Sequence, residues 1–239
     1  TGCGGSVETN TDITKVDPVV PVSDWEMVWN DEFDGDIIDE SNWTYEVYCG
    51  GGNQERQCYT ENAENSFVSD GTLKIVALPA ADGAAQPFTS ARLNSRYKAD
   101  FKYGRFEMSA KLPSGQGSWP AFWMKSTNEV YGTWPKSGEI DIMEHVNTEA
   151  VIHGTHHYNN NGHQYFGSTA FCDASEFQVY GIEWSPSSIK WILNGTMYFQ
   201  ANISSSSVSK EEFHEPFFFL INLAVGGNWP GPPNGSTQF

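Results

Sequence analysis

The sequence has no long apolar run and few basic residues. No stretch of 18 or more consecutive apolar residues occurs, so the sequence predicts no membrane span. The chain has 13 Lys and Arg residues and 30 Asp and Glu residues, which gives a net charge of −17. A chain with this balance lacks the basic surface that a phosphate backbone needs, so nucleic acid is not an expected partner. The balance fits a secreted, monomeric protein with a neutral or cationic ligand.

Cysteines are scarce as well. The four cysteines include Cys49 and Cys58, which flank a Gly-rich stretch. A disulfide across so short a loop is plausible in an exported protein, and two free thiols are the alternative. Cys172 has no obvious mate, and the spacing is not that of zinc ligands. Cys3 ends the tripeptide TGC, which matches the end of a bacterial lipoprotein signal. We expect either a lipid anchor at Cys3, and thus a cell-surface or outer-membrane lipoprotein, or a lone cysteine.

Strand patterns dominate the rest of the chain, and convincing amphipathic helices are absent. Residues 1–23 are polar and unpatterned, which predicts a flexible tether before one domain over residues 24–239. A helical turn is expected at 210–214, and Asn194-Gly195 predicts a hairpin turn. Strands are predicted within residues 72–78, 104–112, 177–185, 189–201 and 217–225. Many short strands separated by turn residues predict an all-β sandwich.

Three carboxylates lie within the apolar stretch GEIDIMEHV, residues 138–146. In a regular strand Glu139 and Asp141 share a face, whereas Glu144 points to the other side. A bulge near residues 142–143 would return Glu144 to the face of the other two acids. Three carboxylates among apolar residues are costly to bury without a purpose. The alternative interpretations are a solvated strand face and a calcium site.

Tryptophans and histidines surround this acidic strand. Trp119, Trp123 and Trp134 precede it, and flat aromatic faces stack on the C–H faces of sugar rings; Trp123 is equally consistent with a core position. The histidines of residues 153–157 alternate between faces, so a zinc site is not predicted. Retaining glycoside hydrolysis uses two carboxyl groups about 5–5.5 Å apart, a nucleophile and a general acid. The setting therefore predicts a polysaccharide hydrolase.

The run Glu-Ile-Asp-Ile-Met-Glu resembles the signature of glycoside hydrolase family 16, in the E-x-D-x-x-E form typical of laminarinase-like endo-β-1,3-glucanases. That form also occurs in agarases and carrageenases. Other segments resemble the family in its usual order, including residues 25–47, 52–77, 103–113, 183–196 and 220–231. The resemblance implies a β-jelly roll of two antiparallel sheets with a substrate cleft across its concave face. It also implies a retaining endo-glycosidase that hydrolyses laminarin-like β-1,3-glucan.

The resemblance also assigns roles to individual residues. It implies that Glu139 is the nucleophile, that Glu144 is the general acid/base, and that Asp141 helps to hold the charge state of the nucleophile. No cofactor is expected in this chemistry. Carbohydrate contacts are expected from Asn53 and Arg96 on the glycone side, Trp119 and Trp134 near the cleaved bond, His157 toward the leaving group, and Trp229 in the GNWPG loop.

A structural calcium on the convex face is a further implication of the resemblance. The matching ligands are Glu32 and the backbone carbonyl of Gly71, and the alternative for Glu32 is a plain surface acid. Members of the family usually take a third ligand from a final strand. The printed sequence does not contain that strand, which leaves the completeness of the calcium site open.

Other functions fit the same residues. Agarose, carrageenan or mixed-linkage glucan could be the substrate, although the low Lys and Arg count argues against sulfated chains and Trp134 favours β-1,3-glucan. A non-catalytic β-glucan-binding protein on this scaffold typically lacks one or both glutamates, and both are present here. A transglycosylase is also possible, because a sugar can replace water in capturing the glycosyl-enzyme.

Overall fold

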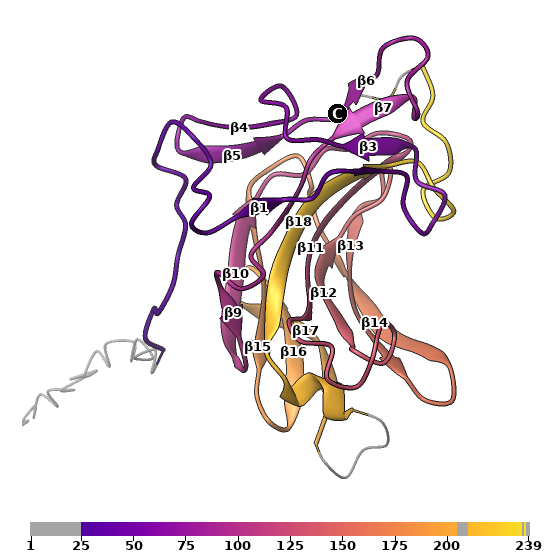
Figure 1. Ribbon diagram of the computed structural model, residues 1–239. Coiled ribbons are helices and arrows are strands. Elements are labelled where there is room, and N and C mark those ends of the chain that lie inside the picture. The colour runs from indigo at the N-terminus through magenta and orange to yellow at the C-terminus, as the bar shows by residue number, and fades with distance from the viewer. Residues whose placement is uncertain (1–24, 205–209, 236, 238–239) are drawn as a thin grey trace, which may run out of the picture.

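The computed structural model describes residues 25–204, 210–235 and 237, which form strands, turns and one short 3₁₀ helix, η1 (Glu211–His214) (Figure 1). The predicted tether lies outside these residues, and η1 confirms the predicted single helical turn. Within the described part of the chain, no helix has the length and apolar character needed to cross a membrane.

The main sheet has eight strands, and all its neighbouring pairs are antiparallel. Its order across the sheet is β1 (Thr44–Tyr45), β8 (Arg92–Asn94), β18 (Phe217–Val225), β11 (Ser118–Ser126), β12 (Glu139–Glu144), β13 (Val151–Asn159) and β14 (His163–Phe171), with β9 (Asp100–Phe101) also paired to β18. The long strands curve through the molecule in Figure 1. Strand β18 is buried at eight of nine positions, as expected for a strand covered on both faces.

The second layer is an antiparallel sheet of four strands. Its order is β10 (Gly104–Ala110), β15 (Gln178–Trp184), β16 (Ser188–Leu193) and β17 (Thr196–Asn202). Asn194 and Gly195 connect the last two strands with φ angles of 50° and 77°. Both values lie in the left-handed region that a tight hairpin turn requires, so the predicted hairpin is confirmed. The all-β sandwich of two antiparallel sheets is likewise confirmed.

Two small sheets complete the fold; the sequence predicted a strand within residues 72–78 but not these sheets. One has the order β2 (Tyr48–Cys49), β3 (Gln57–Tyr59), β7 (Phe88–Ser90) and β6 (Leu78–Pro79), and its β3–β7 pair is parallel. The other is the hairpin of β4 (Ser66–Ser69) and β5 (Thr72–Ile75). Figure 1 shows both at the upper end of the main sheet.

A disulfide joins Cys49 to Cys58 and ties β2 to β3. The alternative of two free thiols is therefore wrong. Cys172 is a free, buried thiol, in keeping with its lack of an obvious mate in the sequence. The disulfide closes the Gly-rich loop of residues 50–57, which forms one wall of the cleft described below.

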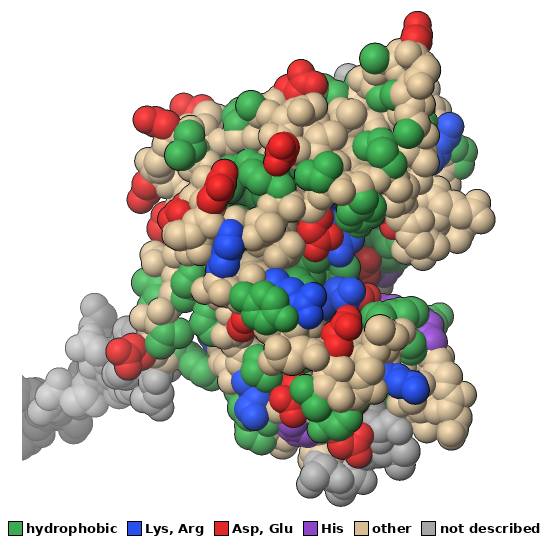
Figure 2. Space-filling model, viewed as in Figure 1, with side chains coloured by type: hydrophobic (Ala, Val, Ile, Leu, Met, Phe, Trp, Pro, Cys, Tyr) green, Lys and Arg blue, Asp and Glu red, His purple; other side chains and the backbone are tan. Residues whose placement is uncertain are grey.

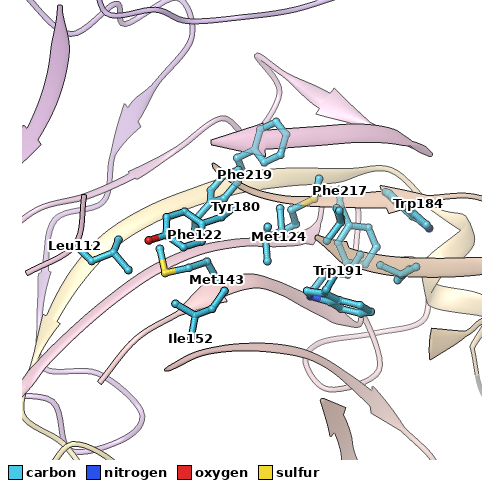
Figure 3. Close-up of a cluster of buried hydrophobic side chains, with 14 of the residues drawn as sticks. Leu112, Phe122, Met124, Met143, Ile152, Tyr180, Trp184, Trp191, Phe217 and Phe219 are labelled. Atoms are coloured by element: carbon cyan, nitrogen blue, oxygen red, sulfur yellow. The ribbon is translucent and has the colours of Figure 1, made fainter. Parts of the chain in front are cut away.

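The core lies between the two main layers (Figure 3). The second sheet contributes Tyr180, Trp184 and Trp191, each at most 1% exposed. Strand β11 contributes Phe122 and Met124. Because side chains alternate along a strand, the neighbouring residues Ala121, Trp123 and Lys125 face away from the core. The main sheet therefore has a core face and an opposite face that is free to bind a ligand.

A β-bulge breaks the alternation in β12. Phe122 of β11 is paired with Met143 and Trp123 with Asp141, so Ile142 has no partner on β11. Ile142 and Met143 are consecutive, yet each is 1% exposed and belongs to the core. The extra residue reverses the face to which the following side chains of β12 point. The predicted bulge at residues 142–143 is thus confirmed.

The backbone just before the bulge is held by Trp191. Its indole Nε1–H donates to the carbonyl oxygen of Asp141 over 2.8 Å. In Trp191→Phe this buried carbonyl loses its donor, and we expect the free energy of unfolding in urea to fall by roughly 1–3 kcal/mol. We also expect kcat/KM to fall, because this carbonyl belongs to the acidic strand.

Trp184→Phe is the matched control. Trp184 is equally buried and donates to the carbonyl oxygen of Phe213 over 3.1 Å, so its hydrogen bond is not made to the acidic strand. This variant should lose comparable stability and keep its kcat/KM. Equal activity losses in Trp191→Phe and Trp184→Phe would contradict a specific role for the bond to Asp141.

Candidate active site

A cleft of about 450 Å³ lies on the face of the main sheet that is opposite the core. Figure 2 shows acidic and histidine side chains where the surface is hollowed at the right of the molecule. The cleft is lined by Tyr48, Gly50, Gly51, Gly52, Asn53, Glu55, Tyr59, Arg92, Trp119, Ala121, Trp123, Lys125, Trp134, Glu139, Asp141, Glu144, Asn222 and Ala224. Aromatic rings and carboxylates dominate this lining.

The acidic strand forms the floor of the cleft. Glu139, Asp141 and Glu144 all line it, so the three carboxylates belong to one site. The bulge is the cause, because it places Ile142 and Met143 together on the core side and returns Glu144 to the face of Glu139. Two carboxyl groups on one floor are the arrangement that glycoside hydrolysis needs.

Each end of the acidic group has a separate polar partner. His157 of β13 is the cross-strand partner of Glu139, and its Nε2 lies 2.9 Å from Asp141 Oδ2 and 3.9 Å from Glu139 Oε1. At the other end, the indole Nε1–H of Trp119 donates to Glu144 Oε1 over 2.9 Å. These contacts fix the carboxylates in different surroundings although they share one cleft.

Burial gives the acidic group unusual proton affinity. Loss of solvation raises the pKa of Glu139, Asp141 and Glu144 each to about 8. The charge of Asp141 is the second cause of the raised pKa at both glutamates. Groups this close titrate together, so the protons belong to the set of three. At neutral pH the set therefore keeps protons that isolated carboxylates would have lost.

Neighbouring groups partly offset the effect of burial on the two glutamates. His157 lowers the pKa of both glutamates, but of the three acids Lys125 lowers the pKa of Glu139 alone. Lys125 is the cross-strand partner of Glu139 on β11 and lines the cleft. Lys125 therefore favours negative charge at Glu139, while the hydrogen bond from Trp119 lowers the pKa of Glu144. A negative charge at Glu139 in turn helps to keep the proton on Glu144, since like charges in one site oppose each other.

Lys125 is a site residue that the sequence analysis missed. The signal for it was present: positions 119, 121, 123 and 125 share one face of β11, and Trp119 was already assigned to the cleft. Trp123, for which core and cleft were both open, lines the cleft, and its Nε1–H donates to Asn222 Oδ1 over 2.7 Å.

Most of the predicted carbohydrate contacts gather around the acids. Asn53, Trp119 and Trp134 line the cleft, and His157 contacts Asp141. Trp229 packs edge-on against Trp119, with ring centroids 5.5 Å apart, and is 42% exposed. These positions give the cleft flat aromatic surface on both sides of the acidic strand.

Arg96 is the exception, and the cleft position belongs to Arg92. The Nε–H of Arg96 donates to the Thr127 carbonyl over 2.9 Å, and its guanidinium packs on the ring of Phe218. Strand β8 ends at residue 94, so Arg96 lies in the following turn. Arg92 lines the cleft instead, paired with Glu46 at 2.8 Å and stacked over Trp123 at 4.6 Å.

The predicted calcium ligands lie away from the cleft. Glu32 is exposed, and its carboxylate accepts a hydrogen bond from the side chain of Asn30 over 3.2 Å. Gly71, at the turn between β4 and β5, has a φ of 66°. Among the described residues, the three His, Asp or Glu side chains whose ligand atoms converge within 4.8 Å are Glu139, Asp141 and His157. That group is the acidic site itself and does not include Glu32.

Comparison with known proteins agrees with this geometry. Residues 52–238 match the sequence profile of Glycosyl hydrolases family 16. A beta-glucanase of Rhodothermus marinus is 43% identical over 87% of this chain and 78% of that protein. The chain belongs to glycosyl hydrolases family 16. It is therefore a glycoside hydrolase.

Other similar proteins extend the comparison. A glucan endo-1,3-beta-glucosidase of Cryptopygus antarcticus is 39% identical over 87% of this chain and 83% of that protein. The crystal structure of the Rhodothermus marinus laminarinase superposes with a TM-score of 0.79 and 40% identity, covering 88% of this chain and 90% of that one. Two longer relatives are matched over 31% and 37% of their own lengths.

The charge of Lys125 gives a test of what favours ionised Glu139 in this family 16 site. Lys125→Met removes a cation that lowers the pKa of Glu139, so that pKa rises. If Glu139 is the nucleophile, as the family resemblance implies, the acid limb of the kcat/KM profile reports its ionisation. That limb should move to higher pH, and the activity at acid pH should fall several-fold. Lys111→Met, at an exposed position outside the cleft, is the control and should leave the profile unchanged. An unmoved acid limb in Lys125→Met would contradict the assignment.

Proposed function

We propose that this family 16 hydrolase cleaves internal bonds of laminarin-like β-1,3-glucan and retains the anomeric configuration. The observation that carries the proposal is the position of Glu139 and Glu144 on one cleft floor, on either side of the bulge. The names of the beta-glucanase, laminarinase and glucan endo-1,3-beta-glucosidase to which the chain is similar support β-1,3-glucan as the substrate.

The reaction proceeds in two displacements. Glu139 attacks the anomeric carbon as the glycosidic C–O bond breaks, and Glu144 gives its proton to the departing oxygen. A covalent glycosyl-enzyme remains on Glu139. Glu144, now a carboxylate, takes a proton from water, whose oxygen attacks the anomeric carbon and displaces Glu139. Configuration is kept because two inversions occur, and Glu144 ends with its proton restored.

The partners of the acids fit these roles. Burial keeps the proton on Glu144 for the first step, and the Trp119 N–H steadies the carboxylate that Glu144 becomes. Asp141, with His157 at 2.9 Å, lies near the nucleophile and shares its electrostatic surroundings. Carboxylates and water complete the chemistry, so no step in it draws on a cofactor.

The walls of the cleft favour a neutral glucan. Trp119, Trp123 and Trp134 supply flat rings, and indole faces suit the apolar C–H faces of glucose. The guanidinium of Arg92 is already paired with Glu46, which leaves less positive charge for sulfate groups. Agarose and carrageenan are therefore weaker candidates than β-1,3-glucan, and mixed-linkage glucan remains the nearest rival.

Two glutamine variants test the roles of the acids on laminarin. Glu139→Gln removes the nucleophile and should lower kcat by more than about 10³-fold. Glu144→Gln removes the proton donor and should lower kcat by about 10²–10⁴-fold. With an aryl β-glucoside whose leaving group needs no proton, the first displacement in Glu144→Gln should recover most of its rate, and Glu139→Gln should stay inactive.

Glu107→Gln, an exposed change on β10, is the control and should hydrolyse laminarin normally. The same assays on lichenan, agarose and carrageenan rank the substrates, and laminarin should give the highest kcat/KM. The proposal fails if laminarin is bound but not cleaved, or if another glycan is cleaved faster.

We further propose a calcium ion at Glu32 and the Gly71 carbonyl. The support is donor chemistry alone, since both are oxygen ligands of the kind that calcium prefers and calcium takes six to eight of them. Calcium should raise the melting temperature of the protein relative to EDTA by a few degrees, and Glu32→Gln should abolish the rise. A melting temperature that is independent of calcium would remove the proposal.

Export from the cell is also proposed. The Cys49–Cys58 disulfide supports it, because such bonds persist in oxidising compartments. A neutral polysaccharide too large to enter a cell would be met there. Cys3, the expected lipid-anchor position, lies outside the described residues.

A further inference from the structure

Beyond the acidic strand, four rings form a continuous aromatic ledge made of Trp134, His157, His163 and Tyr165. His163 lies between the rings of Trp134, at 4.5 Å, and Tyr165, at 5.9 Å. His157 stacks on His163 at 5.1 Å with an angle of 14° between the planes. Tyr165 is 69% exposed, and its ring centroid lies 5.8 Å from that of His157.

The ledge is rigidly joined to the acids. His157 has Nε2 at 2.9 Å from Asp141 Oδ2 and Nδ1 at 2.8 Å from His163 Nε2, so both ring nitrogens have partners. Strand register puts Glu139 opposite His157 and His157 opposite Tyr165. Cross-strand partners share a face, so Tyr165 lies on the cleft side, two strand spacings or about 10 Å from Glu139.

Different elements of the fold lie on the two sides of the acidic strand, and a long substrate would contact both. The residues that wall the cleft on one side of the acids, among them Asn53 and Arg92, come from the Gly-rich loop and from β8. A glucan chain whose cleaved bond lies over β12 has a second arm. With Asn53 on the glycone side and His157 toward the leaving group, as expected from the family resemblance, that arm would lie across β13 and β14, the remaining strands of the sheet. The ledge lies along this course.

We propose that the exposed face of Tyr165, supported by His163, is a binding subsite for a glucosyl unit on the leaving-group side of the cleaved bond. The inference rests on the proposed function and extends it, since Tyr165 and His163 lie beyond the acids and the cleft lining. Tyr and His offer flat faces, and neither contributes a fixed charge at neutral pH that a neutral sugar would have to desolvate. Neighbouring rings hold the Tyr165 side chain, so little conformational entropy is lost when a sugar stacks on it.

Strand β14 has another exposed aromatic residue, Phe171, which serves as a control for Tyr165. Single exposed aromatic residues are common on protein surfaces. Phe171 lies on the same strand with the same side-chain parity and is 79% exposed, but it is opposite Val151, two residues past the position in register with Glu144, and it is not one of the four rings of the ledge. If support by the ledge and register with Glu139 matter, Tyr165 binds sugar and Phe171 does not.

Calorimetric titration in a Glu139→Gln background tests this without turnover. The ligands are a β-1,3-linked glucose disaccharide and a hexasaccharide. Adding Tyr165→Ala should weaken hexasaccharide binding about tenfold, which corresponds to ~1.4 kcal/mol, and leave the disaccharide unaffected. Adding Tyr165→Phe, which keeps the flat face, or Phe171→Ala should preserve the hexasaccharide affinity. Unchanged melting temperatures show that the variants fold.

The single variant Tyr165→Ala, with Glu139 intact, adds a second measurement. The leaving-group side is where an acceptor sugar binds, so the ratio of glycosyl transfer to hydrolysis with added oligosaccharide should fall several-fold. Equal hexasaccharide affinities for the alanine variants at Tyr165 and Phe171 would overturn the subsite. Failure of the proposed function would give a different result. The wild-type protein would then release no sugar from laminarin, whatever Tyr165 contributes to binding.

Discussion

One extra residue in β12 is the constraint on which the site depends. Without the bulge, Glu144 would project toward the core side of the main sheet and Glu139 toward the cleft. With it, Ile142 and Met143 both enter the core and the three acids share one floor. The core supports this irregularity, since two consecutive apolar side chains find space there and Trp191 bonds the carbonyl of Asp141. Packing on one face thus sets the chemistry on the other.

The same arrangement creates an electrostatic problem that the surrounding residues solve. Three buried carboxylates cannot all ionise, and the pKa of each is raised to about 8. Lys125 favours negative charge at Glu139. The Trp119 N–H contacts Glu144 at one end of the acidic group, and His157 contacts Asp141 at the other end. In the proposed mechanism these surroundings let two chemically identical side chains serve as nucleophile and proton donor, which is how paired carboxylates divide their roles.

Much of the fold and of this site was predictable from sequence because both leave local signals. The turn residues Asn194-Gly195 predict the hairpin, and the apolar run predicts the buried strand 217–225. The bulge follows from the odd offset along the sequence between Asp141 and Glu144. Arg92 lines the cleft and Arg96 lies in the turn after β8 ends at residue 94, a difference that resemblance alone, which gives an approximate position, did not reveal. The parallel β3–β7 pair joins distant segments and has no local signature. The ledge was missed because its rings meet only across two strands and a loop.

The proposed mechanism requires that Glu139 is the residue that becomes bonded to the sugar. A 2-deoxy-2-fluoro laminaribioside with an activated leaving group slows the second displacement more than the first, so the glycosyl-enzyme accumulates. Proteolysis and mass spectrometry then identify the labelled side chain. The account predicts one sugar adduct per chain, on Glu139. An adduct on Glu144 or Asp141, or turnover with no adduct and inverted product, would contradict it.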